Sequence, residues 1–253
     1  MARDAASTVI AGAPIPGATP ASQTLDRGLR ALELVAASGT PLTTVEVAGA
    51  LALHRSITYR MLRTLEDRRL VDRDSSGAWV PGVGLAVLAT NVVPEIRSAA
   101  QPVLESLADA TAMTAFLVVR DHDEAVTVAV VEPRSAVAHV TYRPGKRHPV
   151  TRGAPGIALL SGSDPAPDDG GAQRPEVEQC RARGWAYSES EVIQGMKSVS
   201  SPIIDADGTC AAAVALVFVG MHDLDDLGAH VVAAAAEVAR RAERTASQGR
   251  TRP

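Results

Sequence analysis

The chain has 253 residues, 46% of them apolar, and a formal net charge of -4 at pH 7. This length suits one large domain or two of ordinary size, and the apolar share is enough for a packed core. A net negative charge argues against a general coat of nucleic acid, so any contact with DNA needs a local basic patch.

The composition of residues 1–22 predicts a disordered tail rather than a targeting segment. Residues 1–22 mix Ala, Pro, Gly and small polar residues without a period, so they cannot bury enough surface to offset their ordering entropy, and we predict a disordered tail. They lack the continuous apolar stretch of a signal peptide, and no segment of the chain is apolar enough to span a bilayer. We therefore expect a cytoplasmic protein without membrane contact.

The next segment, residues 23–84, predicts a winged helix-turn-helix domain. Apolar residues recur with helical spacing between Leu25 and Ala36. Thr43 and Glu46 have the spacing of a capping box, which predicts a short second helix. After a third helix, two short apolar segments flank the turn-rich residues 74–77, a pattern typical of a hairpin wing. This order of elements places one helix in the major groove of DNA.

The third helix, residues 55–68, is the candidate DNA-reading helix. At about 100° per residue, the side of this helix that we expect to be buried is apolar and carries Ile57, Met61, Leu62 and Leu65. Thr58 falls nearer this side than the polar one. The other side is polar and basic, with no acidic residue between His54 and Thr64. Any solvated helix shows such a division, but the helix-turn-helix context favours DNA contact.

We predict that six side chains contact DNA. First-turn residues of a reading helix reach base edges most easily, so groove contacts are expected from Arg55, Ser56, Tyr59 and Arg60. Phosphate contacts are expected from Arg27 and Arg63. The alternative is a ligand-binding module whose winged helix binds another protein. That module would place apolar or acidic residues where this helix carries arginine, serine and tyrosine.

The second half of the chain predicts an α+β arrangement. Residues 85–102 are expected to form a linker helix, broken or kinked near Pro94 and Pro102. Residues 103–247 are expected to form the second domain. Its predicted elements are strands at 115–119, 125–131 and 137–142, a buried helix at 156–160, a surface loop at 162–175, a helix at 175–183, strands at 202–204 and 210–219, and a final helix at 223–245.

No catalytic or metal-binding pattern stands out. The chain lacks the Gly-x-Ser-x-Gly motif of hydrolases and the Gly-Lys-Ser/Thr ending of a phosphate-binding loop. Three histidines, His122, His139 and His148, are scattered among acids and serines, and His139 is expected to be a core or edge residue rather than a metal ligand because no second ligand lies at useful spacing. The cysteines, Cys180 and Cys210, have no paired spacing, so they are expected to be buried thiols. We expect no enzymatic activity, no cofactor and no metal.

Three stretches together resemble the IclR-type transcriptional regulators. Residues 24–32 resemble the opening helix of that family, and residues 53–65 resemble its recognition helix. Residues 181–208 resemble the signature of its effector-binding domain, which is the most discriminating of the three. The resemblance implies a winged helix-turn-helix, a linker helix and a GAF-like or profilin-like domain with a six-stranded antiparallel sheet. It also implies a DNA operator, a small-molecule effector, a homodimer or tetramer and, most often, a repressor.

The chain departs from this family where the effector is expected to bind. Ile157 stands where the family often has lysine, and Ser198 stands where it often has cysteine. The family's polar positions on the last strand are Ala215 and Val217 here, and a carboxylate buried beside them without hydrogen bonds would be costly. We therefore hypothesise a larger, partly apolar effector. The residues expected to surround it are Ala154, Pro155, Ser188, Ser198, Ala215 and Val217.

Overall fold

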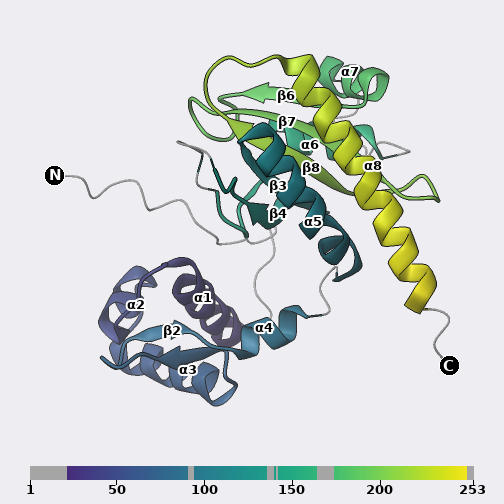
Figure 1. Cartoon of the computed structure of the whole chain (residues 1–253). Coiled ribbons are helices and arrows are strands. Elements are labelled where there is room, and N and C mark those ends of the chain that lie inside the picture. The colour runs from purple at the N-terminus through teal and green to yellow at the C-terminus, as the bar shows by residue number, and fades with distance from the viewer. Residues whose placement is uncertain (1–21, 91–93, 136–139, 141, 164–173, 250–253) are drawn as a thin grey trace. The chain divides into compact units, whose positions relative to one another are not determined.

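The computed structural model describes residues 22–90, 94–135, 140, 142–163 and 174–249. The chain divides into two compact units, residues 1–92 and 93–253 (Figure 1). The predicted tail therefore lies outside the described residues, except for Ser22. Among the helices that the structure describes, none combines the length and apolar character needed to cross a membrane.

The first unit has the elements of a winged helix. In chain order they are α1 (Gln23–Ala37), α2 (Thr44–Ala50), α3 (Arg55–Asp67), β1 (Val71–Arg73), β2 (Trp79–Pro81) and α4 (Gly84–Ala89). The predicted capping box is confirmed, because Glu46 N donates to Thr43 Oγ1 at 3.3 Å and Thr43 N donates to Glu46 Oε2 at 2.7 Å. The helices and the hairpin enclose one core, made of Ala31, Val35, Val47, Leu62, Val71 and Trp79.

The buried side of α3 differs by one position from the prediction. Thr58 and Leu62, four residues apart, are fully buried, whereas Ile57 is 40% exposed. The prediction that Ile57 lies on the buried side was therefore wrong. Thr58 tolerates burial because its hydroxyl donates to His54 O at 3.3 Å, which leaves no unsatisfied polar group.

The hairpin wing is confirmed. β1 and β2 are antiparallel, with Arg73 opposite Trp79. The turn between them is held by Asp74, whose Oδ1 accepts from Ser76 N and Ala78 N, both at 2.9 Å. Gly77 has a φ of 82°, a conformation that glycine adopts without strain. The wing is tied to α2 because Trp79 Nε1 donates to Thr44 Oγ1 at 3.0 Å.

The second unit is a six-stranded antiparallel sheet in the order β5-β4-β3-β8-β7-β6, as the family resemblance implied (Figure 1). Its elements are α5 (Pro94–Thr111), β3 (Thr114–Asp121), β4 (Glu124–Val131), β5 (Arg147–Pro149), α6 (Gly153–Ser161), α7 (Pro175–Arg183), β6 (Ala186–Glu189), β7 (Lys197–Ile204), β8 (Cys210–Phe218) and α8 (Leu224–Gly249).

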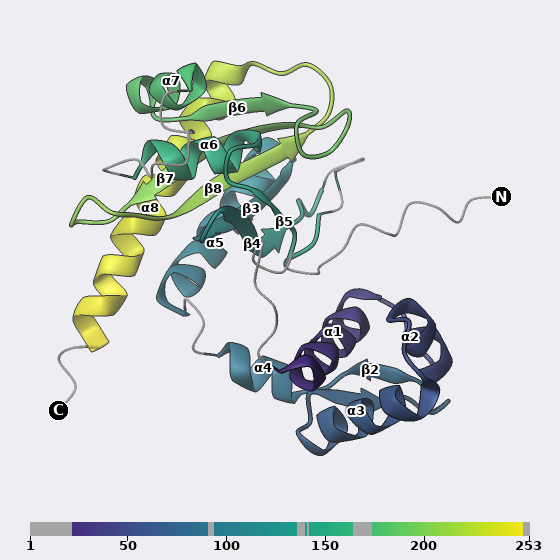
Figure 2. The same ribbon diagram turned by 180° about the vertical axis from the view of Figure 1, so that it is seen from behind.

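Helices cover both faces of this sheet, as the two opposite views show (Figures 1 and 2). α5 and α8 pack on one face, where Val214 and Leu216 belong to their core. α6 and α7 pack on the other face, where Ala213 and Val217 belong to a separate core. Because successive side chains of a strand point to opposite faces, β8 is buried on both sides and reads as an almost continuous apolar segment.

Pro102 does not break the helix in which it lies. α5 runs unbroken from Pro94 to Thr111, so the predicted break near Pro102 was wrong, and the predicted boundary after residue 102 falls inside α5. Pro102 lacks an N–H, but its carbonyl still accepts from Ser106 Oγ at 3.0 Å. The buried residues around it, Ala99 and Val103, pack into the core and offset the lost hydrogen bond.

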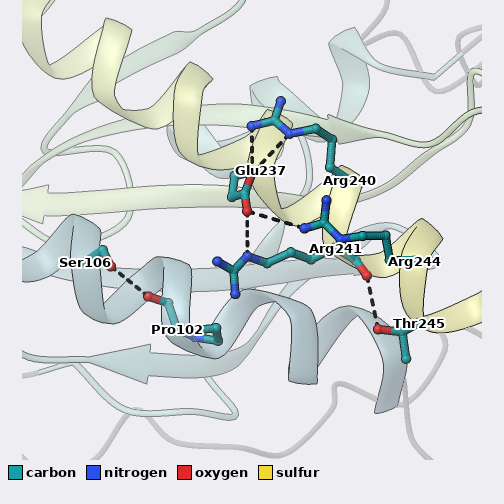
Figure 3. A network of polar contacts seen from close by, with 7 residues as sticks. All are labelled: Pro102, Ser106, Glu237, Arg240, Arg241, Arg244 and Thr245. Carbon is teal, nitrogen blue, oxygen red and sulfur yellow. Dashed lines mark hydrogen bonds and ion pairs between the residues drawn. The ribbon is translucent and has the colours of Figure 1, made fainter.

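Figure 3 shows the place where α8 crosses α5. On α8, Glu237 accepts from Arg240 Nη2 and from Arg241 Nε, both at 2.7 Å, and Arg244 Nη2 lies 3.6 Å from the same carboxylate. These arginines hold the pKa of Glu237 below its usual value, Arg241 having the largest effect and Arg240 the next. The network keeps the charged side of α8 in solvent while its apolar side packs on α5.

Several other predictions can be compared with the structure. The strands near 115–119, 125–131, 202–204 and 210–219, and the helices near 156–160, 175–183 and 223–245, are confirmed. Gly184 ends α7 with a φ of 85°, as expected for a helix C-terminus. Most of the predicted strand at 137–142, with His139, and most of the loop at 162–175 lie outside the described residues. Two short strands, β5 and β6, were missed because their three and four residues are too few to show alternation.

Candidate functional site

A groove lies between the start of α3 and the wing in the first unit. It has a volume of about 610 Å³. Three predicted DNA-contact residues line it, Arg55, Ser56 and Tyr59, whereas Arg27, Arg60 and Arg63 do not. The complete lining is Thr43, Thr44, Val45, His54, Arg55, Ser56, Tyr59, Arg73, Ser76, Gly77 and Ala78.

The first turn of α3 is arranged for contact with a polyanion. His54 caps the helix, with its Nδ1 accepting from Ser56 N at 3.3 Å. No acidic side chain lies in this turn, and the side chains of Arg55 and Ser56 are exposed. The helix N-terminus and the arginine together make this end of α3 attractive to phosphate.

The other predicted contacts differ in their surroundings. Arg60 is exposed on α3 and Arg27 is half-buried on α1. Arg63 Nη1 lies 2.7 Å from Glu66 Oε2, and its Nη2 lies 3.8 Å from Asp67 Oδ1. A phosphate that binds Arg63 therefore competes with two carboxylates of the same helix. We had not predicted the wing residues Arg73 and Ser76, because no helical period marks a two-stranded wing.

A second hollow lies in the other unit, on the face of the sheet covered by α6. Its enclosed volume is about 30 Å³, close to that of one water molecule, and it opens to solvent. Four predicted effector residues line it, namely Pro155, Ser188, Ser198 and Val217. Ala154 and Ala215 are fully buried and do not line the pocket. The lining residues that the sequence did not single out for this pocket are Phe116, Tyr142, His148, Gly153, Glu191, Val192, Ile193, Met196 and Lys197.

One wall of this pocket is aromatic and apolar. Phe116 on β3 and Tyr142 pack with their ring centroids 4.7 Å apart. Val217 on β8 and Met196 extend the apolar lining. Burial raises the pKa of the Tyr142 hydroxyl, so its ring is neutral at physiological pH. This wall suits a flat apolar ring rather than a small charged molecule.

The opposite wall is polar, and side chains of the protein accept the hydrogen bonds that the first backbone N–H groups of α6 could offer a ligand. Gly153 N donates to Glu191 Oε2 at 2.8 Å, and Ala154 N donates to Ser188 Oγ at 2.8 Å. Pro155 follows and has no N–H to offer. The Arg152 guanidinium also donates to Glu191 O. Ser188 and Glu191 are therefore tied to the start of α6, and the pocket presents few free backbone donors to a carboxylate.

His148 supplies a neutral polar group beside this wall. Its Nδ1 lies 3.0 Å from Pro149 O, which fixes the ring when Nδ1 carries the hydrogen. Burial lowers the pKa of this imidazole below its ordinary value, so the ring is neutral and Nε2 is an acceptor. The cation of the pocket, Lys197, lies 3.6 Å from Glu189 Oε1 and is partly neutralised. Among the described residues, no cluster of side chains suited to a metal ion is found.

Two family models cover most of the chain. The IclR helix-turn-helix domain matches residues 24–75, and the bacterial transcriptional regulator IclR C-terminal domain matches residues 89–170 and 169–242. The chain belongs to the IclR family. This IclR-family protein is thus a DNA-binding transcriptional regulator with an N-terminal helix-turn-helix and a C-terminal effector domain. The alternative, a winged helix that binds a protein, finds no support in these matches.

Individual relatives agree with this assignment. The regulator BhcR of Paracoccus denitrificans is 29% identical over 216 residues, which cover 76% of each chain. The repressor AllR of Salmonella typhimurium is 26% identical over 222 residues, which cover 79% of this IclR-family chain and 81% of AllR. An IclR homologue from Microbacterium hydrocarbonoxydans, solved with 4-hydroxybenzoate, has the same fold, with a TM-score of 0.75, 20% identity, and coverage of 87% and 99%.

Proposed function

We propose that this protein is a repressor whose hold on DNA is controlled by a small molecule in the pocket of the second unit. The observation that carries the DNA-binding part is the groove where Arg55, Ser56 and Tyr59 of α3 meet the wing. Relatives named as repressors support the negative sign of regulation. Such a regulator acts where the genome lies, which supports a cytoplasmic location.

We further propose an effector with a single ring and at least one hydroxyl group. The enclosed volume of the pocket is about 30 Å³, room for little more than a water molecule, so a ring can enter only if lining side chains move. Phe116 and Tyr142 give it an aromatic wall, and neutral His148 can accept from a hydroxyl. The 4-hydroxybenzoate bound by the structural neighbour is also a single hydroxylated ring, but it adds a carboxylate, for which this pocket has few free donors. The aromatic wall thus supports the partly apolar part of the hypothesis, while the small enclosed volume gives no support to a larger effector.

Two measurements on the full chain test this proposal. Calorimetric titration should detect binding of 4-hydroxybenzyl alcohol, weaker binding of 4-hydroxybenzoate because its carboxylate finds few free donors, and no binding of a two- or three-carbon acid. Binding of the DNA that flanks its own coding region, followed by fluorescence anisotropy, should weaken when the ring compound is added. Tight binding of the small acid alone would overturn the proposed effector class.

A matched pair of variants distinguishes a specific effect on the pocket from a general effect on the fold. Val217→Trp fills the pocket and should abolish effector binding while DNA binding remains. Val219→Trp adds the same ring at an exposed position just beyond β8, and it should bind effector as wild type does. Equal loss of effector binding in both variants would contradict the assignment of the pocket.

The regulator is also proposed to be a homodimer. A single winged helix offers few base contacts, and paired half-sites require two copies. In the first unit, exposed apolar side chains gather on α1 and α4, namely Leu25, Leu29, Val83, Val87 and Leu88. Sedimentation should show a dimer that Leu88→Asp dissociates, whereas Met221→Asp, also at an exposed position, should leave the dimer intact. A wild-type monomer at micromolar concentration would contradict the proposal.

A further inference from the structure

Arg73 occupies the junction between the wing and the DNA-reading helix. It is the last residue of β1, and its guanidinium carbon lies 4.1 Å from the centroid of the Trp79 ring and 5.6 Å from that of Tyr59. Its Nε lies 3.2 Å from Glu66 Oε1 on α3. Trp79 is buried, whereas Tyr59 is 44% exposed toward the groove. One side chain therefore contacts the core, the wing and the reading face of α3.

The guanidinium is held by stacking and charge rather than by hydrogen bonds. Its Nε and Nη2 are shielded from solvent, yet neither has a partner in hydrogen-bond geometry within the described chain. Glu66 faces two cations, because its other oxygen accepts from Arg63 Nη1 at 2.7 Å. A planar, delocalised cation stacks on an aromatic ring, but the compact ammonium of lysine does not reproduce this contact. The arrangement thus depends on the shape of arginine as well as on its charge.

We propose that Arg73 is a positioning residue for DNA recognition. By stacking on Trp79 and lying beside Tyr59, it fixes the Tyr59 side chain against the wing, so that α3 and the wing meet DNA as one surface. Tyr59 contacts the DNA, and Arg73 acts through it. This inference rests on the predicted role of Tyr59 as a groove contact.

Two other roles for Arg73 make different predictions. If Arg73 bound a DNA phosphate directly, a lysine in its place would retain most of the affinity, because lysine also binds phosphate as a point charge. If Arg73 only stabilised the fold, its loss would lower the melting temperature of the first unit and leave discrimination between sequences unchanged. A positioning role requires a loss of discrimination that depends on Tyr59.

A double-mutant cycle on the full chain distinguishes these roles. The variants are Arg73→Lys, Tyr59→Ala and the double variant, with Arg68→Lys as a control at the exposed end of α3. The probe is the duplex that the wild-type chain enriches from a random DNA library, together with versions mutated at single base pairs. Affinity is measured by fluorescence anisotropy at several salt concentrations, and the melting temperature is recorded for each variant.

Arg73→Lys should weaken binding to the enriched duplex by about threefold to tenfold and reduce its preference over the mutated versions. The salt dependence should not change, because the charge is retained. In the Tyr59→Ala background the same change should have little further effect. Wild-type affinity of Arg73→Lys, an equal loss in both backgrounds, or a loss explained by melting alone would overturn the proposal, as would a Tyr59→Ala variant that binds as wild type does.

Discussion

The groove of the first unit and the pocket of the second are built in opposite ways. The groove is lined by residues from Thr43 to Ala78, a short and continuous part of the sequence, and it is open and basic. The pocket is lined by residues from Phe116 to Val217, which lie about a hundred positions apart in the sequence and are mostly buried. A surface that reads a polyanion can be made locally, whereas a cavity for a small molecule needs distant strands to meet.

The two regions also use charge differently. At the start of α3, Arg55 is exposed and has no acid in its helical turn. In the pocket, Lys197 is paired with Glu189, and the start of α6 is occupied by Glu191. In the proposed function, the groove acts through long-range attraction that salt weakens, and the pocket selects its ligand by shape and neutral hydrogen bonds.

The largest expected effect tests whether the two regions are independent. Leu62 is fully buried in the core of the first unit, so Leu62→Ala should cost that unit about 2–5 kcal/mol of stability. Calorimetry should show one transition moved to lower temperature, and DNA binding should be lost near it. Effector binding by the second unit should remain. Loss of effector binding at the same temperature would show that the units do not fold separately.

A smaller effect is expected from the groove itself. Arg55→Ala should weaken specific DNA binding by about 1–3 kcal/mol and relax the sequence preference if Arg55 contacts a base. If it contacts only phosphate, the variant should mainly lower the salt dependence of binding. Anisotropy titrations at several salt concentrations measure both quantities. Unchanged affinity would contradict the assignment, and Arg68→Ala provides a control of equal charge loss.

The capping box of α2 should contribute less. Thr43→Ala removes the acceptor of Glu46 N and should lower the stability of the first unit by about 1 kcal/mol. Urea unfolding followed by circular dichroism measures this change. Thr43→Ser keeps the acceptor and should lie close to wild type. A serine variant as unstable as the alanine variant would show that the methyl group, not the cap, matters.

The smallest expected effect is a pH dependence confined to the second unit. Burial lowers the pKa of His148 in the folded state, so the unfolded chain binds a proton more readily. Stability from this group is fully present above the unfolded pKa of about 6.5 and falls as pH decreases below it. The melting temperature of the second unit at pH 7.5 and pH 5.5 should show this fall. His148→Gln should reduce it, and an equal fall in both proteins would assign it to other groups.

The contrast explains how much the sequence predicted. The helices of the first unit, the capping box at Thr43 and the wing were predicted because each follows a local pattern. The exposure of Ile57 was missed because a helical period does not say which of two adjacent residues faces the core. Pro102 misled because the loss of one hydrogen bond is outweighed by the packing of α5.

The pocket was less accessible to prediction for a physical reason. The residues marked by the family resemblance, such as Ser188 and Val217, do line it. Phe116, His148 and Glu191 carry no local signal, because they reach the pocket only when β3, β5 and the segment after β6 are brought together. These residues were missed because they are far apart in the sequence, although their side chains are chemically suited to a binding pocket.

Strand β8 serves two layers of the second unit at once. Val217 lines the pocket, while its neighbours Leu216 and Phe218 pack among α5 and α8 on the opposite face. Protein interiors are close-packed and have low compressibility, so a displacement of this strand is not absorbed within one layer. A ligand that displaces Val217 therefore also displaces Leu216 and Phe218, whose face of β8 packs against α8. Because β8 contributes side chains to the cores on both faces of the sheet, a shift of this strand on the pocket side also changes the packing on the opposite face.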